Sequence, residues 1–326
     1  AIRPAWLRGL VESAARTVFF LSALARYRYF VFYGKMIVPA LPLNRLWKRL
    51  WGPSADGYLS LAKALGKKVV YIPSGCLDEE LKSYFSQMDD GRMCSNCWVV
   101  SCSDEAALPY LRRHARYADL VVGNGCFDSS HFERAHLKYK SIDLDLWRPD
   151  RVAPDRQRLP ATRNIRILHT FIRTGRLRMD RNIKGSPFVL DAVEMLKKEQ
   201  IPVELMSVSD VPSSDMRSYQ LQADVIVDQL IYGWWGSTGI EAMALGKPLV
   251  CYLRPSWKEF FLKTFPEYEG LPVVEADTNT IADVLRRLVM DKEYRERKGA
   301  ESRAFAERHF NPKANARSLA EAFLKL

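Results

Sequence analysis

The chain lacks the features that define several classes of protein. It contains no run of about 18 uncharged apolar residues, so a transmembrane helix is not expected. The apolar stretch Val18–Ala25 is short and lies between arginines, unlike the core of a signal peptide. Six cysteines in 326 residues are too few for a disulfide scaffold. With 17 glycines and 17 prolines the chain is also no linker protein, so we expect a globular, cytoplasmic protein of two domains.

Acidic side chains are scarce at the start of the chain. Residues 1–55 hold nine Lys or Arg and one acid, Glu12, which gives +8 of the net charge of +11. Aromatic residues are mixed among these cations, most densely in Arg45–Trp51. Cations beside Trp and Tyr are typical of a surface that contacts anionic lipid, although a solvated helix face has the same composition. We therefore expect either a solvated face or peripheral contact with the inner face of a membrane. Nucleic acid is not an expected partner, because zinc-finger, RNP and basic-zipper patterns are absent.

Strands and helices alternate along the chain, most regularly in its second half. Such alternation predicts an α/β fold with doubly wound, Rossmann-like parallel sheets. Strands are predicted at 29–33, 68–72, 119–123 and 139–142, and then at 165–171, 203–208, 223–229, 249–253 and 272–275. Helices are predicted at 104–117, at 127–135, from Ser186 as N-cap, and from Gly239 to Leu245. We expect an N-terminal domain at 1–150, a C-terminal domain at 151–311, and a last helix at 312–326 that follows the second domain or crosses back to the first.

The most informative segment runs from the strand at 223–229 into a glycine-rich loop and a helix that starts near 237–239. Ligands of open α/β sheets bind beyond the carboxyl ends of the strands, and a helix N-terminus there favours phosphate. Glu241, in the first turns of the helix, is placed to accept ribose hydroxyls. The residues predicted to line this phosphate site are Asp228, Gln229, Gly236, Ser237, Thr238 and Gly239, with His169 lining it from an earlier strand.

The run Glu241-Ala-Met-Ala-Leu-Gly-Lys-Pro248 resembles the C-terminal signature of GT-B glycosyltransferases of the retaining, family-4-like group. Two further segments, Asp180–Ser186 and Ser141–Pro149, resemble the diphosphate-gripping element and the exit from the N-terminal domain in that group. The resemblance covers roughly 118–316. It implies two Rossmann-like domains that face a cleft, a UDP- or GDP-sugar donor, and transfer without a required cofactor to a glycan or lipid-linked acceptor, in a cell-envelope setting.

The resemblance also assigns catalytic roles. Departure of a nucleoside diphosphate builds negative charge, which Arg181 and Lys184 would neutralise, while Glu241 would hold the donor. One position departs from the pattern: Gly233 stands where the group has a first glutamate, which contacts the donor sugar, so sugar recognition must differ. This departure keeps two alternatives open, a sugar-nucleotide epimerase on the same fold and a non-catalytic, glycosyltransferase-like binding subunit.

Two further groups of residues are candidates in the N-terminal half. Ser74, Gly75 and Asp78 follow a predicted strand and would face an acceptor. No metal is expected in catalysis. A zinc site is a weaker alternative, because Cys94 and Cys97 have zinc-knuckle spacing. Cys102 would be a third ligand, and Cys76 or His114 would complete the set.

Overall fold

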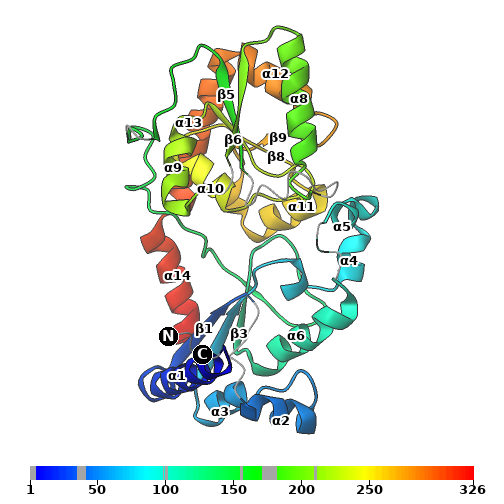
Figure 1. The fold of residues 1–326 in the computed structure, drawn as a ribbon, viewed down its shortest axis with the longest axis vertical. Coiled ribbons are helices and arrows are strands. Elements are labelled where there is room, and N and C mark those ends of the chain that lie inside the picture. The colour runs from blue at the N-terminus through cyan, green and yellow to red at the C-terminus, as the bar shows by residue number, and fades with distance from the viewer. Residues whose placement is uncertain are drawn as a thin grey trace. The chain divides into compact units, whose positions relative to one another are not determined.

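The computed structural model describes residues 5–34, 42–97, 99, 102–154, 157–170, 182–208 and 211–326 (Figure 1). Its internal contacts divide the chain into two units. Unit 1 comprises Ala1–Gln87, Ser101–Leu137 and Ala320–Leu326, and unit 2 comprises Met88–Val100 and Lys138–Leu319. Two stretches assigned above to the N-terminal domain, Met88–Val100 and 138–150, thus pack with unit 2.

Unit 1 is built on a four-stranded parallel sheet in the order β1-β2-β3-β4. Its strands are β1 (Tyr29–Tyr33), β2 (Lys68–Ile72), β3 (Leu120–Gly123) and β4 (Ala135–His136), and its helices are α1 (Ala5–Arg26), α2 (Pro42–Trp51), α3 (Gly57–Ala64), η1 (Cys76–Asp78), α4 (Lys82–Ser86) and α6 (Asp104–Tyr117). Four of the five residues of β2 are buried, as expected for an inner strand covered on both faces. Asp56 and Ser103 cap α3 and α6 by accepting hydrogen bonds from first-turn amides.

Unit 2 contains a five-stranded parallel sheet in the order β6-β5-β7-β8-β9. Its strands are β5 (Ile165–Thr170), β6 (Val203–Val208), β7 (Val225–Val227), β8 (Leu249–Cys251) and β9 (Val274–Glu275). Its helices are η2 (Met88–Gly91), α5 (Arg92–Ser95), α8 (Ser186–Lys198), α9 (Ser213–Leu221), α10 (Ser237–Ala244), α11 (Pro255–Thr264), η4 (Pro266–Tyr268), α12 (Ile281–Met290), α13 (Lys292–His309) and the first part of α14 (Pro312–Leu324). The rest of α14 belongs to unit 1, where Phe323 stacks on Tyr29.

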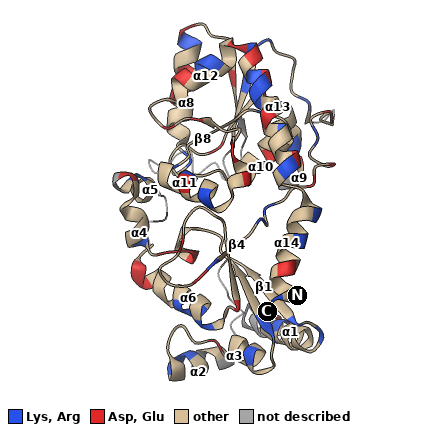
Figure 2. Ribbon diagram, turned by 180° about the vertical axis from the view of Figure 1, so that it is seen from behind, with Lys and Arg blue, Asp and Glu red and all other residues tan. Residues whose placement is uncertain are grey.

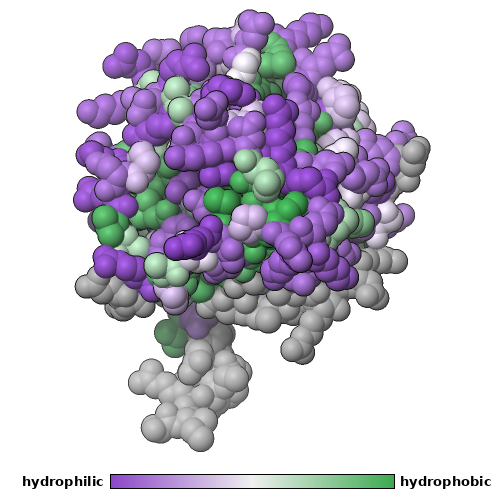
Figure 3. Space-filling view, turned by 90° about the horizontal axis from the view of Figure 1, so that it is seen from above, coloured by the Kyte–Doolittle hydropathy of each residue, from purple (hydrophilic) through white to green (hydrophobic). Residues whose placement is uncertain are grey.

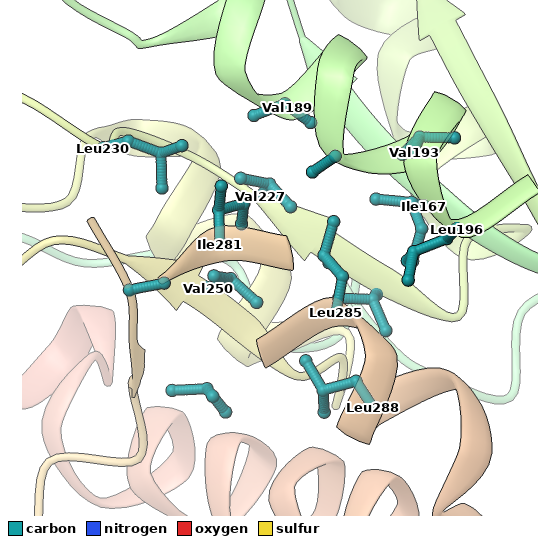
Figure 4. Close-up of a cluster of buried hydrophobic side chains, with 14 of the residues drawn as sticks. Ile167, Val189, Val193, Leu196, Val227, Leu230, Val250, Ile281, Leu285 and Leu288 are labelled. Carbon is teal, nitrogen blue, oxygen red and sulfur yellow. The ribbon is translucent and has the colours of Figure 1, made fainter. Parts of the chain in front are cut away.

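Aliphatic side chains from the sheet of unit 2 and from α8 and α12 form one core (Figure 4). In α12, Ile281, Leu285 and Leu288 recur at helical spacing and are buried against it. Basic and acidic residues both occur along α12 and α13 (Figure 2). In the view of Figure 3 the surface is mainly hydrophilic, with apolar side chains in limited areas. Within the described part of the chain, no helix is long and apolar enough to span a membrane.

Two elements predicted in the N-terminal half are wrong. Residues 127–135 form no helix, because their polar groups bind buried acids instead: the Ser130 amide donates to Glu80, and Arg134 pairs with Glu79 at 2.7 Å. Residues 139–142 form no strand, since Ile142 donates its backbone N–H to Phe310 outside any sheet. The strand beside β3 is β4 instead.

Candidate nucleotide-sugar site

The strand order of unit 2 creates a switch point between β5 and β7. The chain passes from β5 outward to β6 and then returns to β7 on the other side of β5. Connections that leave a sheet in opposite directions open a crevice at the carboxyl ends of the two strands, and ligands bind there. Thr170 ends β5, and Asp228 follows β7 directly. These two residues therefore mark the expected position of a ligand.

Lys184 extends from the loop that leads into α8 and reaches this point. Its Nζ lies 3.3 Å from Asp228 Oδ1 and 3.5 Å from Thr170 Oγ1. The loop is held by its backbone: Lys184 N–H donates to Asn182 Oδ1, and its carbonyl accepts from Leu230 N–H. Gly185 next to it has φ of 75°, and a Cβ there would lie 2.8 Å from Leu230 Cβ. Glycine is therefore needed to bring the lysine to the sheet edge.

Asp228 joins the lysine to the start of α10. Its side chain is 1% exposed, and Oδ2 accepts a hydrogen bond of 2.6 Å from the Gly236 amide, the N-cap of α10. Thr238 Oγ1, in the first turn of α10, lies 3.4 Å from Thr170 Oγ1. Lys184, Thr170, Asp228 and the first turn of α10 are thus linked by direct contacts. A full positive charge and the positive end of a helix dipole meet at one place, which favours an anion such as a diphosphate.

The glycines around α10 differ in how much space a side chain would have. A Cβ at Gly239 would lie 2.6 Å from Trp235 Cβ, so the helix can pack on the preceding loop only without a side chain. A Cβ at Gly236 would make ordinary contacts of 3.5 Å with Asp228 and Gln229. Gln229 Nε2 donates to the Trp234 carbonyl at 3.0 Å, which holds the loop between β7 and α10. Ser237 is exposed at the start of the helix.

Glu241 lies one turn into α10 and contacts a residue that the sequence did not indicate. Its Oε2 accepts a hydrogen bond of 2.6 Å from Gln220 Nε2 of α9, and Gln220 is fully buried. Burial raises the pKa of Glu241, and the negative charge of Asp228 adds to this effect, against the hydrogen bond from Gln220. Hydroxyl or amide donors beside Glu241 would stabilise its charged form.

His169 supports the site from inside the protein and does not face a ligand. Its side chain is fully buried, Nδ1 lies 2.8 Å from the Val227 carbonyl, and Nε2 lies 2.9 Å from Ser186 Oγ. Burial lowers the pKa of His169 to about 4, helped by the charge of Lys184, so the ring is neutral at pH 7. The expectation that it lines the site is corrected accordingly. Ser186 is likewise no N-cap, because its hydroxyl binds His169 and Asn182 inside the protein.

The predictions for Arg181 and for zinc meet different outcomes, and two tryptophans beside the donor loop are buried. Arg181 lies outside the described residues. Trp234 and Trp235 stack on each other with ring centroids 4.3 Å apart and are each 4% exposed, so they pack in the protein. Across the described part of the chain, no three His, Cys, Asp or Glu side chains form a group that could hold a metal ion. The weaker zinc alternative at Cys76, Cys94, Cys97 and Cys102 therefore has no support from the structure.

The residues predicted to face an acceptor cluster at the carboxyl end of β2 in unit 1. Ser74 N–H donates to Asp78 Oδ2 at 3.4 Å, and Gly75 between them has φ of 128°. Asp78 is 5% exposed, and its carbonyl accepts a hydrogen bond from Tyr71 Oη. The buried acids that follow, Glu79 and Glu80, were not expected from the sequence.

Comparison with known proteins agrees with this architecture. Residues 182–305 match the family described as glycosyl transferases group 1. No curated protein matches the chain significantly. Sucrose-phosphate synthase from Thermosynechococcus elongatus has a similar structure, with a TM-score of 0.59 and 16% identity over 94% of this chain and 76% of the synthase. HepE from Anabaena, solved with UDP and glucose, has a TM-score of 0.57 and 15% identity over 95% of this chain and 81% of HepE.

A third similar structure is the pneumococcal O-GlcNAc transferase GtfA, solved with UDP and GlcNAc, with a TM-score of 0.51 and 12% identity over 83% of this chain and 55% of GtfA. At these identities the structures establish the fold. The chain therefore has a GT-B fold, with a glycosyl transferases group 1 match over residues 182–305. The matched segment contains Lys184, Asp228 and Glu241.

Proposed function

We propose that the protein transfers a sugar from a UDP- or GDP-sugar to a glycan or lipid-linked acceptor. One observation carries the proposal: the contacts that join Lys184, Thr170, Asp228 and the first turn of α10 at the switch point of the sheet. Lys184 and the N-terminus of α10 offer positive charge to a diphosphate, which would compete with Asp228 for both of them. That HepE was solved with UDP and glucose supports a nucleotide-sugar donor.

The roles of the residues follow from the charges of the reaction. Breaking the sugar–diphosphate bond leaves negative charge on the diphosphate and positive charge at the anomeric carbon. Lys184 pairs with Asp228 in the absence of donor, and it would shift its charge toward the leaving diphosphate, with Arg181 and the amides at Ser237–Gly239 as further partners. Glu241 would accept the ribose hydroxyls. In this proposal the cations do the work that a metal does elsewhere, and the sugar keeps its anomeric configuration.

Donor binding is the first test. Calorimetry with UDP and GDP should show that Lys184→Ala and Glu241→Ala each lose at least tenfold in affinity for the nucleotide that wild type binds. Lys258→Ala is the matched control, because Lys258 pairs with Glu275 at the surface of the same unit. Unchanged nucleotide affinity in both site variants would contradict the assignment.

Turnover separates transfer from the alternatives. Lys184→Ala should lower kcat by about 10²–10³, the usual cost of removing one group that stabilises transition-state charge. Transfer should persist in EDTA, and NMR of the product should show retained configuration. Conversion of the donor without acceptor would favour an epimerase instead. Nucleotide binding with no reaction across a panel of acceptors would favour a binding subunit.

For the acceptor, we propose the cluster at the end of β2. Ser74 offers an exposed hydroxyl at the carboxyl edge of a parallel sheet, where ligands bind, and the buried Asp78 holds this turn by accepting a hydrogen bond from the Ser74 amide. Ser74→Ala should raise the acceptor KM and leave nucleotide affinity as in wild type. An effect on nucleotide affinity alone would refute this role.

We also propose that α1 holds the protein at an anionic membrane surface. Phe20 and Leu24 pack in the core of unit 1, whereas Val18 and Phe19 are 67% and 76% exposed. Arg16 and Arg26 are exposed on the same helix. Exposed apolar groups beside cations suit the boundary of headgroups and acyl chains.

Vesicle flotation tests the membrane proposal. The vesicles contain about one anionic lipid in three, as phosphatidylglycerol in phosphatidylcholine. They should bind wild type, and the Phe19→Asp variant should bind several-fold less. Val152→Asp is the control, since Val152 is 74% exposed in unit 2. Equal binding to vesicles of phosphatidylcholine alone, or no effect of Phe19→Asp, would exclude α1 as the contact.

A further inference from the structure

Gly233, in the loop between β7 and α10, has no room for a side chain. Its φ is 103°, and a Cβ at this position would lie 2.9 Å from both Cβ and Nε of Arg254. Arg254 N–H also donates to the Gly233 carbonyl at 2.9 Å, which ties the loop after β7 to the segment after β8. The guanidinium group therefore occupies the volume of a side chain at position 233. A cation stands where the resemblance places a carboxylate.

Arg254 lies at the same sheet edge as the proposed donor site. It comes three residues after the end of β8, the strand next to β7, and its side chain is 2% exposed. Nη2 donates to the Tyr232 carbonyl at 3.0 Å, and the guanidinium lies over the ring of Trp257, 4.5 Å from its centre. Nε and Nη1 are buried and have no hydrogen-bond partner among the residues that the structure describes.

Two unsatisfied donors make this a costly place for a cation. A buried charge is tolerated when its hydrogen-bonding groups are paired, and each buried donor without an acceptor destabilises the folded protein. The guanidinium has five N–H donors in a planar fork that matches a carboxylate. A carboxylate that bound the side-on edge of the guanidinium, through Nε as well as Nη2, would remove part of this cost.

Asp89 of η2 supplies the carboxylate that Arg254 has in this structure. Its Oδ2 lies 3.2 Å from Arg254 Nη2 and also accepts a hydrogen bond of 3.1 Å from Tyr252 Oη. Asp89 is held less firmly than Arg254, because its side chain is 26% exposed and its backbone has φ of 47°. An aspartate in this left-handed region is conformationally strained. The contact shows that the position accepts a carboxylate, and Asp89 binds Nη2 without reaching Nε on the same edge of the guanidinium.

We propose that Arg254 makes the donor site selective for a nucleotide sugar whose transferred sugar carries a carboxylate, that is, a uronic acid. The inference rests on the proposed function, because it assigns the sugar of the same donor. Gly233 lies in the loop that brings Gly236 to Asp228 and starts α10, and the proposal places the sugar of the donor beside the guanidinium that fills the space at Gly233. A uronate carboxylate would replace Asp89 at Nη2 and also pair Nε on the same edge. A neutral hexose would leave Nε unpaired, and sites with buried polar groups discriminate strongly against such substrates.

The experiment compares matched donors on the full chain. Calorimetry is run with UDP, UDP-glucose and UDP-glucuronic acid, and with GDP, GDP-mannose and GDP-mannuronic acid. For the base that binds, we expect the uronate at least tenfold tighter than its neutral hexose. Arg254→Gln should lower uronate affinity at least tenfold, whereas Arg286→Gln, which removes a carboxylate-bound surface arginine of the same unit, should not.

The outcomes separate this inference from the proposed function. If UDP or GDP binds and the neutral sugar nucleotide binds as tightly as the uronate, the uronic-acid proposal is overturned and the glycosyltransferase site stands. If neither nucleotide binds, the donor site itself is wrong. Asp89→Asn covers the case in which Arg254→Gln does not fold: it should tighten uronate binding severalfold relative to the hexose, and an unchanged ratio would overturn the proposal.

Discussion

The pair formed by Lys184 and Asp228 allows a quantitative test of the site without any ligand. The two side chains are 16% and 1% exposed, and their charged atoms lie 3.3 Å apart. Removing one partner of a buried ion pair costs about 3–5 kcal/mol, because the other charge stays buried without compensation. Asp228 keeps the Gly236 amide as a hydrogen-bond donor, and Lys184 is partly exposed. We therefore expect Lys184→Met to lower the free energy of unfolding by about 2–3 kcal/mol.

The control is Lys258→Met. Lys258 and Glu275 also form an ion pair in unit 2, but their side chains are 36% and 48% exposed. Exposed pairs contribute about 0–1 kcal/mol, so this variant should be close to wild type. The double variant Lys184→Met/Asp228→Asn removes both charges and should recover at least about 1 kcal/mol of the loss.

The assay is urea unfolding at pH 7 followed by tryptophan fluorescence, with the transition of unit 2 fitted separately if the units unfold in two steps. A loss for Lys184→Met no greater than that for Lys258→Met would refute the reasoning. It would mean that Asp228 is compensated by water or by the backbone, and the proposal of a concentrated positive charge at the switch point would lose its basis.

Three further predictions follow from the same region. Burial lowers the pKa of His169 to about 4 from 6.5, so only the unfolded chain gains a proton as the pH falls between these values. At pH 5 the free energy of unfolding should therefore be lower by about 2 kcal/mol than at neutral pH. In unfolding experiments, His169→Asn should lose that part of the pH dependence. Burial raises the pKa of Glu241, so the folded protein loses stability as the pH rises above the ordinary pKa of a glutamate. Glu241→Gln should be as stable as wild type at pH 4 and more stable at pH 7. A variant that is less stable than wild type at pH 7 would refute the raised pKa. Gly239→Ala places a Cβ 2.6 Å from Trp235 Cβ and should lower the melting temperature with a loss of about 1–3 kcal/mol, which a thermal melt measures.

Regular elements could be predicted where local pattern and tertiary packing agree. The strands at 29–33, 68–72 and 203–208 match the structure to the residue, and α14 begins at Pro312 as expected. In these segments the period of apolar residues and the capping or breaking residues point to the same answer. The prediction failed at 127–135 and 139–142, where side chains and amides bind partners far away in the sequence. The local sequence pattern does not indicate hydrogen-bond partners that are distant in the sequence.

The sequence by itself determined the class of fold and the approximate place of the site, because parallel strands expose their carboxyl ends at one edge whatever their order. Only the tertiary structure decided that Thr170 and Asp228 flank the switch point, since strand order depends on packing between distant segments. It alone turned His169 inward, gave Glu241 a buried partner in Gln220, and filled the space at Gly233 with Arg254. Each of these contacts joins residues on different elements, and burial and charge at such contacts arise only when the elements pack.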